Sequence, residues 1–318
     1  MTGKMLLLFA LTLLIGPAYS QSPQRPDFLI KDSIQSSLDR NVQVFYYDKS
    51  TASSPQPLVV ELHSWSNSAD SQKDMVAVQA HAKEWNYIFP NFRGVNNHPK
   101  ACCSEFVISD IDEAIDWAVK NMKVDTKHIY VIGTSGGGYA TLAMYMKSRH
   151  TIHTFSAWAA ISDLEAWYGE SSERKNKYAA EIVKCIGAGE TFDAQKAKER
   201  SPLFWKTPVK KRKNSQLQIY AGIHDGYTGS VPISHSINFY NKLLTDNNEK
   251  DKSHYVSETD AITMLKTQTF PTSNPPEMIG DRAILYQKSS KKITLTIFEG
   301  THEILKNVAL ELVEAPKS

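Results

Sequence analysis

The stretch Tyr130-Val131-Ile132-Gly133-Thr134-Ser135-Gly136-Gly137-Gly138-Tyr139 decides the fold of this chain. An apolar run typical of a buried strand leads into a Gly-x-Ser-x-Gly turn and then into a helical pattern. Because that turn is sharp, the residues beside the serine must be small, and the sequence places Gly133 and Gly137 there. The pattern predicts a nucleophile elbow. It would expose the Ser135 hydroxyl at the carboxyl end of a sheet, above a helix N-terminus that favours negative charge.

Apolar strand patterns and helical patterns alternate on both sides of the elbow. Runs that predict strands occupy residues 43–48, 57–62, 87–90, 128–132, 155–161, 216–221 and 292–298. Helical spacing of apolar residues occupies residues 74–85, 109–122, 136–147, 233–244 and 303–313. This alternation predicts a single α/β domain over residues 21–318, doubly wound around a mostly parallel sheet. Two long insertions, residues 163–213 and 246–290, are expected to form a cap or lid.

The composition is that of an ordinary globular protein, since 41% of the 318 residues are hydrophobic and 22% are charged. The formal net charge of +2 is too small to predict binding to nucleic acid or to a membrane surface. One basic run, residues 206–213, stands out. It is expected to be a solvated loop. The alternative is a surface that binds an acidic polymer.

The first twenty residues have the pattern of a signal peptide. Lys4 supplies a positive charge, and the apolar run at residues 5–15 is too short to span a bilayer. Small residues, Ala18 and Ser20, precede the expected cleavage before Gln21. No cysteine follows the apolar run, so no lipid anchor is expected, and a buried N-terminal helix is the alternative reading. The pattern predicts a secreted or periplasmic protein.

The chain has three cysteines, Cys102, Cys103 and Cys185. In an oxidising compartment, a disulfide between Cys185 and one of the adjacent pair is expected, with Cys102 preferred. A zinc site is not expected, because three cysteines without a paired Cys/His spacing lack a fourth ligand. No metal and no other cofactor is predicted. Cysteine catalysis is disfavoured because neither residue of the pair follows a strand in a Gly-flanked turn.

A serine hydroxyl needs a histidine to take its proton and a carboxylate to orient that histidine. In α/β-hydrolases these groups follow the serine in the order Ser, Asp/Glu, His. Asp225 comes directly after the strand pattern at 216–221, and His302 follows the last strand pattern at 292–298. The sequence therefore predicts a triad of Ser135, Asp225 and His302. Two other histidines compete for the role of base, and they are His224 and His235.

An oxyanion hole requires two backbone N–H groups. Gly136, directly after the nucleophile, is expected to supply one. The loop after an earlier strand would supply the other, from Trp65 or, as second choice, from Ser64. His63 is expected to orient this loop.

Three side chains are candidates for contacts with the substrate. Arg93 follows another strand, where its guanidinium could hold a carboxylate such as that of a uronic acid, or could stabilise a turn. Trp167 and Tyr168 in the first insertion could stack on a sugar ring or belong to the core.

Residues 110–117, the elbow at 133–139, residues 225–236 and residues 299–303 carry a family resemblance. Together they resemble the catalytic domain of the prolyl oligopeptidase family and the secreted esterases built on it, over roughly residues 43–313. The resemblance implies an α/β-hydrolase fold, a serine mechanism and the same triad. Peptidases of the family carry an N-terminal β-propeller, which the roughly twenty residues between the expected cleavage site and the first expected strand do not accommodate. Ser64 also replaces the second residue of the usual His-Gly oxyanion motif.

These features predict a secreted serine hydrolase that forms an acyl-enzyme intermediate. Without a propeller to filter peptides, open access to large substrates favours an esterase for acyl or methyl esters on polysaccharides or their fragments. A small serine peptidase of prolyl oligopeptidase type is the alternative. A hydrolase fold used only for binding is a third reading, disfavoured because all three catalytic groups are present.

Overall fold

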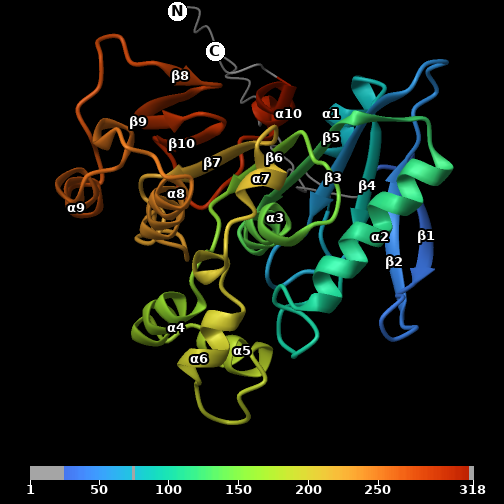
Figure 1. The fold of residues 1–318 in the computed structure, drawn as a ribbon, viewed down its shortest axis with the longest axis horizontal. Coiled ribbons are helices and arrows are strands. Elements are labelled where there is room, and N and C mark those ends of the chain that lie inside the picture. Colours follow the sequence, from blue (N-terminus) through green and yellow to red (C-terminus); the bar gives the residue numbers. More distant parts are fainter. Residues whose placement is uncertain (1–24, 74–75, 315–318) are drawn as a thin grey trace, which may run out of the picture.

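The computed structural model describes residues 25–73 and 76–314, so the expected signal peptide at residues 1–20 lies outside the described residues. Within them, ten strands form one sheet (Figure 1). In their order across the sheet the strands are β1 (Ile30–Gln35), β2 (Val42–Asp48), β4 (Asn86–Pro90), β3 (Gln56–Leu62), β5 (Val124–Thr134), β6 (Thr154–Trp158), β7 (Gln216–Gly222), β10 (Ile293–Phe298), β9 (Arg282–Ser290) and β8 (Met278–Ile279).

The six central strands pair in parallel, and they are β4, β3, β5, β6, β7 and β10. At the two edges, β1 and β2 on one side and β9 and β8 on the other pair antiparallel. The mostly parallel sheet of the predicted α/β-hydrolase class is confirmed. The helices are α1 (Ala77–Ala82), α2 (Glu105–Asn121), α3 (Gly136–Lys147), α4 (Leu164–Glu173), α5 (Tyr178–Cys185), α6 (Ala194–Glu199), α7 (Val209–Arg212), α8 (Ser234–Asp246), α9 (Glu258–Thr267) and α10 (Lys306–Glu314), with two short 3₁₀ turns, η1 (Pro202–Phe204) and η2 (Lys252–His254).

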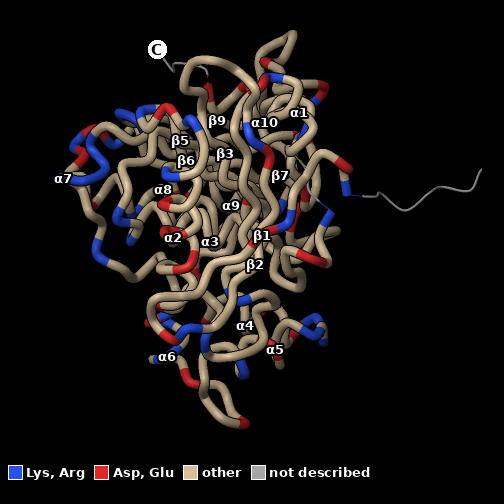
Figure 2. The backbone as a smooth tube through the Cα atoms, turned by 90° about the vertical axis from the view of Figure 1, so that its right-hand side faces the viewer, with Lys and Arg blue, Asp and Glu red and all other residues tan. Residues whose placement is uncertain are grey.

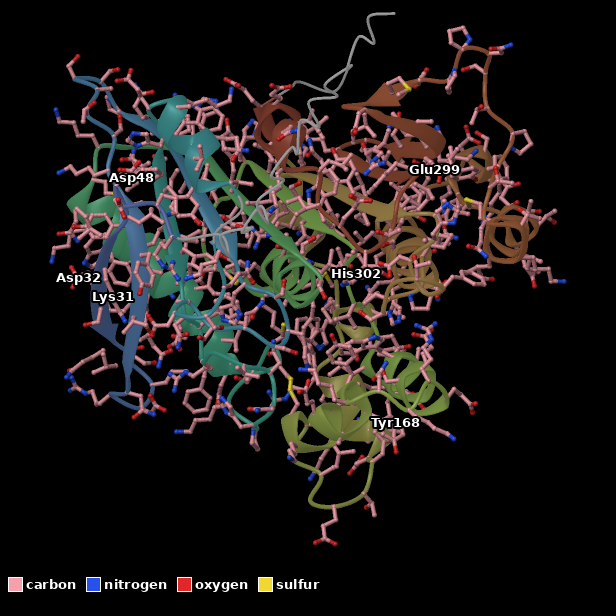
Figure 3. The ribbon with its side chains drawn as sticks, turned by 180° about the vertical axis from the view of Figure 1, so that it is seen from behind. Lys31, Asp32, Asp48, Tyr168, Glu299 and His302 are labelled. Atoms are coloured by element: carbon pink, nitrogen blue, oxygen red, sulfur yellow. A yellow bond between two sulfur atoms is a disulfide. The ribbon has the colours of Figure 1, made fainter. Side chains whose placement is uncertain are left out.

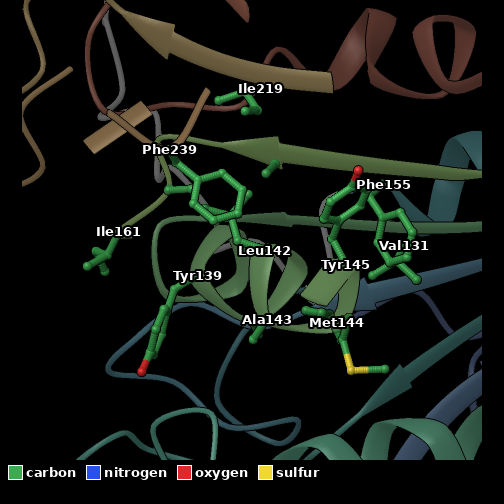
Figure 4. Packing of buried hydrophobic residues seen from close by; sticks show 14 of the residues in the cluster. Val131, Tyr139, Leu142, Ala143, Met144, Tyr145, Phe155, Ile161, Ile219 and Phe239 are labelled. Carbon is green, nitrogen blue, oxygen red and sulfur yellow. The ribbon is translucent and has the colours of Figure 1, made fainter. Parts of the chain in front are cut away.

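Two hydrophobic clusters lie on the opposite faces of the sheet. One cluster contains the apolar sides of α2, α3 and α8, and the other contains those of α1 and α10. Figure 4 shows the first cluster close by, where Leu142 and Tyr145 of α3 pack near Val131 and Phe155 of the central strands. This packing fixes α3 directly beneath the end of β5, which is where the elbow is. No described helix has both the length and the apolar character needed to cross a bilayer.

Three strands, β1, β8 and β9, were not predicted, and all lie toward the edges of the sheet. The residues of β1 are mostly exposed, so their sequence lacks the apolar run that marks a buried strand. The strand β9 falls inside the insertion at 246–290, which was expected to be a lid. Instead, Arg282–Ser290 pairs with β10 and extends the main sheet. Its polar residues reflect an edge position, because only one face of such a strand is covered.

Residues 163–213, called the cap from here on, form α4 to α7 and η1. Figure 1 shows α4, α5 and α6 below the sheet. The disulfide joins Cys102, in the loop before α2, to Cys185 at the end of α5. Their Cα atoms are 5.9 Å apart. The cap is therefore covalently fastened to the domain beneath it, and Cys103 stays a buried free thiol.

The basic run at 206–213 includes α7, and Lys and Arg gather there on the surface (Figure 2). One member is not solvated as expected. Arg212 is only 3% exposed, and its guanidinium donates to the carbonyl oxygens of Met144, Tyr145, Ser148 and His150. Burial lowers its pKa to about 10. Arg212 thereby donates to carbonyl groups in the last turn of α3 and in the residues that follow it, where helical carbonyl groups run out of backbone partners.

Candidate active site

Ser135 occupies a strained backbone conformation between β5 and α3. Its φ is 58° and its ψ is −118°, outside the regions that L-residues ordinarily populate. The chain passes so close to itself here that a Cβ on Gly133 would lie 2.4 Å from the carbonyl carbon of Gly137. A Cβ on Gly137 would lie 2.1 Å from the carbonyl oxygen of Leu62. The glycines are thus required by sterics, and the turn presents Ser135 at the end of the sheet.

The predicted acid and base form a hydrogen-bonded pair. His302 Nδ1 lies 2.7 Å from Asp225 Oδ2, and the Asp225 side chain is fully buried. The other carboxylate oxygen, Oδ1, accepts the backbone N–H groups of Gly226 at 2.9 Å and Val231 at 3.0 Å. A carboxylate held in this way orients the imidazole and fixes its proton on Nδ1. His302 Nε2 is then left as the acceptor that a serine nucleophile requires.

Parallel pairing brings these groups to one edge of the sheet. Thr134, the last residue of β5, aligns with Trp158 of β6, which in turn aligns with Tyr220 of β7. Gly222 at the end of β7 aligns with Phe298 at the end of β10. Ser135, Asp225 and His302 follow the ends of β5, β7 and β10, so all three lie at the same edge. Figure 3 shows His302 at the edge of the sheet toward the cap.

The loop that carries Asp225 is packed tightly against the pair. A Cβ on Gly229 would lie 2.2 Å from Asp225 Oδ1 and 2.5 Å from His302 Cβ. The next carbonyl, that of Ser230, accepts the indole N–H of Trp167 at 2.8 Å. The cap helix α4 therefore helps to hold the loop that positions the acid.

Two backbone amides meet beside the nucleophile. A Cβ on Gly136 would lie only 2.2 Å from the backbone nitrogen of Trp65, which places the two predicted oxyanion donors next to each other. The alternative donor, Ser64, gives its N–H to Gln72 Oε1 at 2.6 Å. Among residues 25–73 and 76–314, no acceptor takes the Trp65 N–H. The geometry thus favours Trp65 over Ser64 as the partner of Gly136.

The sequence matches the prolyl oligopeptidase family over residues 74–261, which is more than half of the chain. The chain is a member of the prolyl oligopeptidase family. This membership confirms the resemblance found in the sequence. Among curated proteins, no sequence matched this one.

Solved structures show the same fold in longer proteins. A putative dipeptidyl aminopeptidase IV from Bacteroides ovatus superposes on 90% of this chain with a TM-score of 0.56 and 13% identity. A puromycin-hydrolyzing peptidase from Mycobacterium tuberculosis covers 75% with a TM-score of 0.54 and 16% identity. The acylaminoacyl peptidase of Pyrococcus horikoshii covers 69% with a TM-score of 0.52 and 16% identity. The match spans 34%, 37% and 36% of those chains, respectively, about a third of each.

His63 positions the loop after β3, as the sequence predicted. This loop carries Ser64 and Trp65 and is called the oxyanion loop from here on. The ring is fully buried and stacks on Phe92 with a centroid distance of 3.8 Å. Nδ1 lies 3.0 Å from the Ser64 carbonyl oxygen and Nε2 lies 2.7 Å from that of Asn91. Burial lowers the pKa of His63. It ties the loop after β3 to the loop after β4.

The two competing histidines have other partners. His224 Nε2 contacts Glu299 Oε1 at 2.6 Å and Nδ1 contacts Gln268 Oε1 at 3.0 Å, and these hydrogen bonds raise its pKa. His235 is 2% exposed and contacts Glu170 Oε2 at 3.1 Å. With both ring nitrogens of His224 engaged and His235 buried in α8, neither is arranged as a base for Ser135.

The prediction that Arg93 binds substrate is corrected by the structure. The guanidinium is buried, and Nε and Nη2 donate to both oxygens of Asp110, at 2.6 and 3.0 Å. Nη1 donates to Asp39 at 2.7 Å, and Nη2 also donates to the Ser36 hydroxyl at 2.7 Å. Sequence reasoning missed these partners because they lie on distant segments. Every terminal group of Arg93 is therefore engaged inside the fold.

The aromatic candidates in the cap are also packed rather than presented to a ligand. Trp167 is fully buried and packs edge-on against Trp65, with ring centroids 4.7 Å apart. Tyr168 stacks on Phe192 at 3.9 Å, and Figure 3 shows it on α4, farther from the sheet than His302. Both side chains are therefore used for packing inside the protein, which is the alternative to sugar stacking. Trp65 is fixed further, because its indole N–H donates to Glu181 Oε2 of α5 at 2.8 Å.

Proposed function

We propose that this protein is a serine peptidase that cleaves amide bonds in short peptides, with Ser135 as nucleophile, His302 as base and Asp225 as the orienting acid. The observation that carries the proposal is the buried Asp225–His302 pair, in a chain whose elbow and acid both fall inside the matched family region. The structural neighbours named above are peptidases by their descriptions. Their likeness lends support through the shared fold.

The proposed reaction follows from the positions of the groups. His302 Nε2 takes the proton of the Ser135 hydroxyl while the oxygen attacks the substrate carbonyl carbon. The N–H groups of Gly136 and Trp65 receive the charge that develops on the carbonyl oxygen. His302 then gives its proton to the leaving amine, and the C–N bond breaks to leave an acyl-enzyme. Water repeats the sequence, releases the acid and restores Ser135.

The hypothesis of a polysaccharide esterase is no longer supported by the side chains that were expected to contact the substrate. It relied on Arg93 to hold a uronic acid carboxylate and on Trp167 and Tyr168 to stack on sugar. Those side chains are engaged inside the fold instead. A serine triad can hydrolyse both bond types, so the choice between peptide and polysaccharide ester is a question of measured rates.

The deciding experiment compares two substrate sets on the same enzyme. One set holds N-acyl dipeptides and aminoacyl p-nitroanilides, and the other holds p-nitrophenyl acetate with acetylated and methyl-esterified oligosaccharides. We expect amide hydrolysis that the Ser135→Ala variant lowers by on the order of 10⁶ in turnover, with an unchanged circular dichroism spectrum. Turnover of the oligosaccharide esters with no amide cleavage would overturn the peptidase proposal. Equal activity of the Ser135→Ala variant would overturn the triad.

A further inference from the structure

The segment between α4 and α5 carries three cationic side chains in four positions. Residues 174–177 read Arg-Lys-Asn-Lys, and this group is called the cationic cap segment. It follows the end of α4 at Glu173 and precedes the start of α5 at Tyr178. All three cations are exposed to solvent. The contacts of the two end members place the segment at the edge of the catalytic groups.

Arg174 reaches the side of the site that holds the acid and the base. Its Nη1 donates to the carbonyl oxygen of Gly229 at 3.3 Å. Gly229 packs against Asp225 Oδ1 and His302 Cβ. The Arg174 guanidinium therefore contacts a residue that itself contacts the Asp225–His302 pair. His302 delivers a proton to the leaving group during cleavage. Groups on this side of the site therefore face the part of the substrate that departs.

Lys177 reaches the opposite side, where the oxyanion loop lies. Its Nζ donates to the Ser66 hydroxyl at 2.7 Å, and Ser66 directly follows Trp65. Lys177 also lies 3.3 Å from Glu181 Oε1, and 58% of its side chain is exposed. One short segment of the cap thus touches both loops that build the catalytic centre.

The acidic residues of the cap leave Arg174 available for a ligand. Glu170 pairs with His235, and Glu181 accepts from Trp65 and pairs with Lys177. Among the residues that the structure describes, the Arg174 side chain forms no ion pair with a carboxylate, and its only hydrogen bond engages one terminal nitrogen. A guanidinium with free N–H groups matches a carboxylate through two parallel hydrogen bonds.

We propose that Arg174 binds a carboxylate on the leaving group of the substrate, and that Lys177 adds positive charge across the site. The substrate class is then a short peptide with its free C-terminal carboxylate close to the bond that is cut, so that a C-terminal amino acid or dipeptide is released. This rests on the proposed peptidase function for the nature of the bond. The charge preference itself can be measured on an amide or on an ester.

The test uses substrates that differ only in this charge. N-acetyl dipeptides and tripeptides are compared as free acids and as C-terminal amides, and O-acetyl-lactate is compared with O-acetyl-lactamide. We expect wild-type kcat/KM to favour the acid of a pair by about three- to fivefold, the size expected for an exposed charge-assisted contact. Arg174→Ala should bring the ratio close to one, and Arg174→Lys should keep part of it. Lys184→Ala, which removes an exposed cation on α5, should leave the ratio unchanged.

Two results would overturn the proposal. One is wild-type enzyme that cleaves the acid and the amide of each pair equally well. The other is an Arg174→Ala variant that loses activity equally toward both members, because that loss would mean Arg174 only supports the Gly229 loop. If the lactate esters are cleaved and no peptide is, the peptidase proposal fails alone. The acid-to-amide ratio of the ester pair then decides the role of Arg174.

Discussion

At the scale of single residues, the sequence predicted the groups whose position follows from a strand end. Ser135, Asp225 and His302 each follow a predicted parallel strand, and parallel strands deliver their ends to one edge. The choice between Trp65 and Ser64 needed coordinates, because the Ser64 amide is taken by a glutamine whose partner no pattern reveals. A side chain's partners depend on packing between distant segments. Sequence reasoning could therefore place Arg93 near a strand end but could not tell that its donors were occupied.

Cys103 is a residue whose reactivity the structure predicts. It is buried, and burial raises the pKa of its thiol to about 12. Thiolate is the reactive form, so native protein at pH 8 should resist iodoacetamide. Unfolding in guanidinium without a reductant should expose one reactive thiol, and unfolding with a reductant should expose all three cysteines. Mass spectrometry counts the adducts.

The same pKa shift has a consequence for stability. The folded thiol keeps its proton to higher pH than the unfolded thiol, which ionises near about 8.5. This contribution to stability is therefore present below that value and is lost as the pH rises through the range toward 12. Rapid labelling of Cys103 in the native protein at pH 8 would contradict the buried assignment.

At the scale of elements, the cap is part of the catalytic centre as well as a cover for it. The helix α4 holds the loop of Asp225 through the Trp167–Ser230 hydrogen bond. The helix α5 holds the oxyanion loop through the Trp65–Glu181 hydrogen bond, and its last residue carries the disulfide. The sequence indicated the insertion at 163–213 and the disulfide, but it gave no sign of these two hydrogen bonds, which join residues far apart in the chain.

Replacing Glu181 with alanine tests this view of α5. The Trp65 indole would lose its acceptor, so the backbone N–H that faces the developing oxyanion would be held less firmly. Removal of an oxyanion donor costs about 10²–10³ in kcat, and a loosened donor should cost less, about tenfold. We expect the loss in kcat with little change in KM, since the contact acts in the transition state.

The matched control for that variant is Glu190→Ala, which removes an exposed acid from the same cap. It should leave kcat unchanged. Steady-state kinetics on the best amide or ester substrate give both values, and thermal unfolding checks that the variants remain folded. A Glu181→Ala enzyme with wild-type kcat would show that the oxyanion loop is held without help from α5.

At the scale of the whole molecule, the alternation of strands and helices was enough to predict the architecture. The central strands are buried on both faces and therefore carry continuous apolar runs, as β3, β5 and β7 do. The strands that were not predicted, β1, β8 and β9, lie toward the edges of the sheet, and most of their residues are exposed or only partly buried. Pairing of an edge strand is decided by its neighbour in the sheet, which a local pattern does not contain.

The ion pairs of Arg93 join segments that are far apart in sequence, so this residue contributes to the stability of the whole molecule. The guanidinium connects the loop after β4 to Asp110 of α2 and to Ser36 and Asp39 in the turn between β1 and β2. Its side chain is only 3% exposed. Removing one partner of a buried ion pair leaves the other charge unpaired and typically costs about 3–5 kcal/mol.

We therefore expect Arg93→Ala to lower the free energy of unfolding by about that amount, measured by chemical denaturation. Lys100→Ala is the matched control. Lys100 also pairs with Asp39, at 2.7 Å, but 46% of its side chain is exposed, and such pairs are worth about 0–1 kcal/mol. Under conditions where Arg93→Ala is still folded, its kcat/KM should change equally for anionic and neutral substrates. A stable variant whose kcat/KM falls only for anionic substrates would show that Arg93 binds substrate. That result would contradict the assignment of its donors to contacts inside the fold.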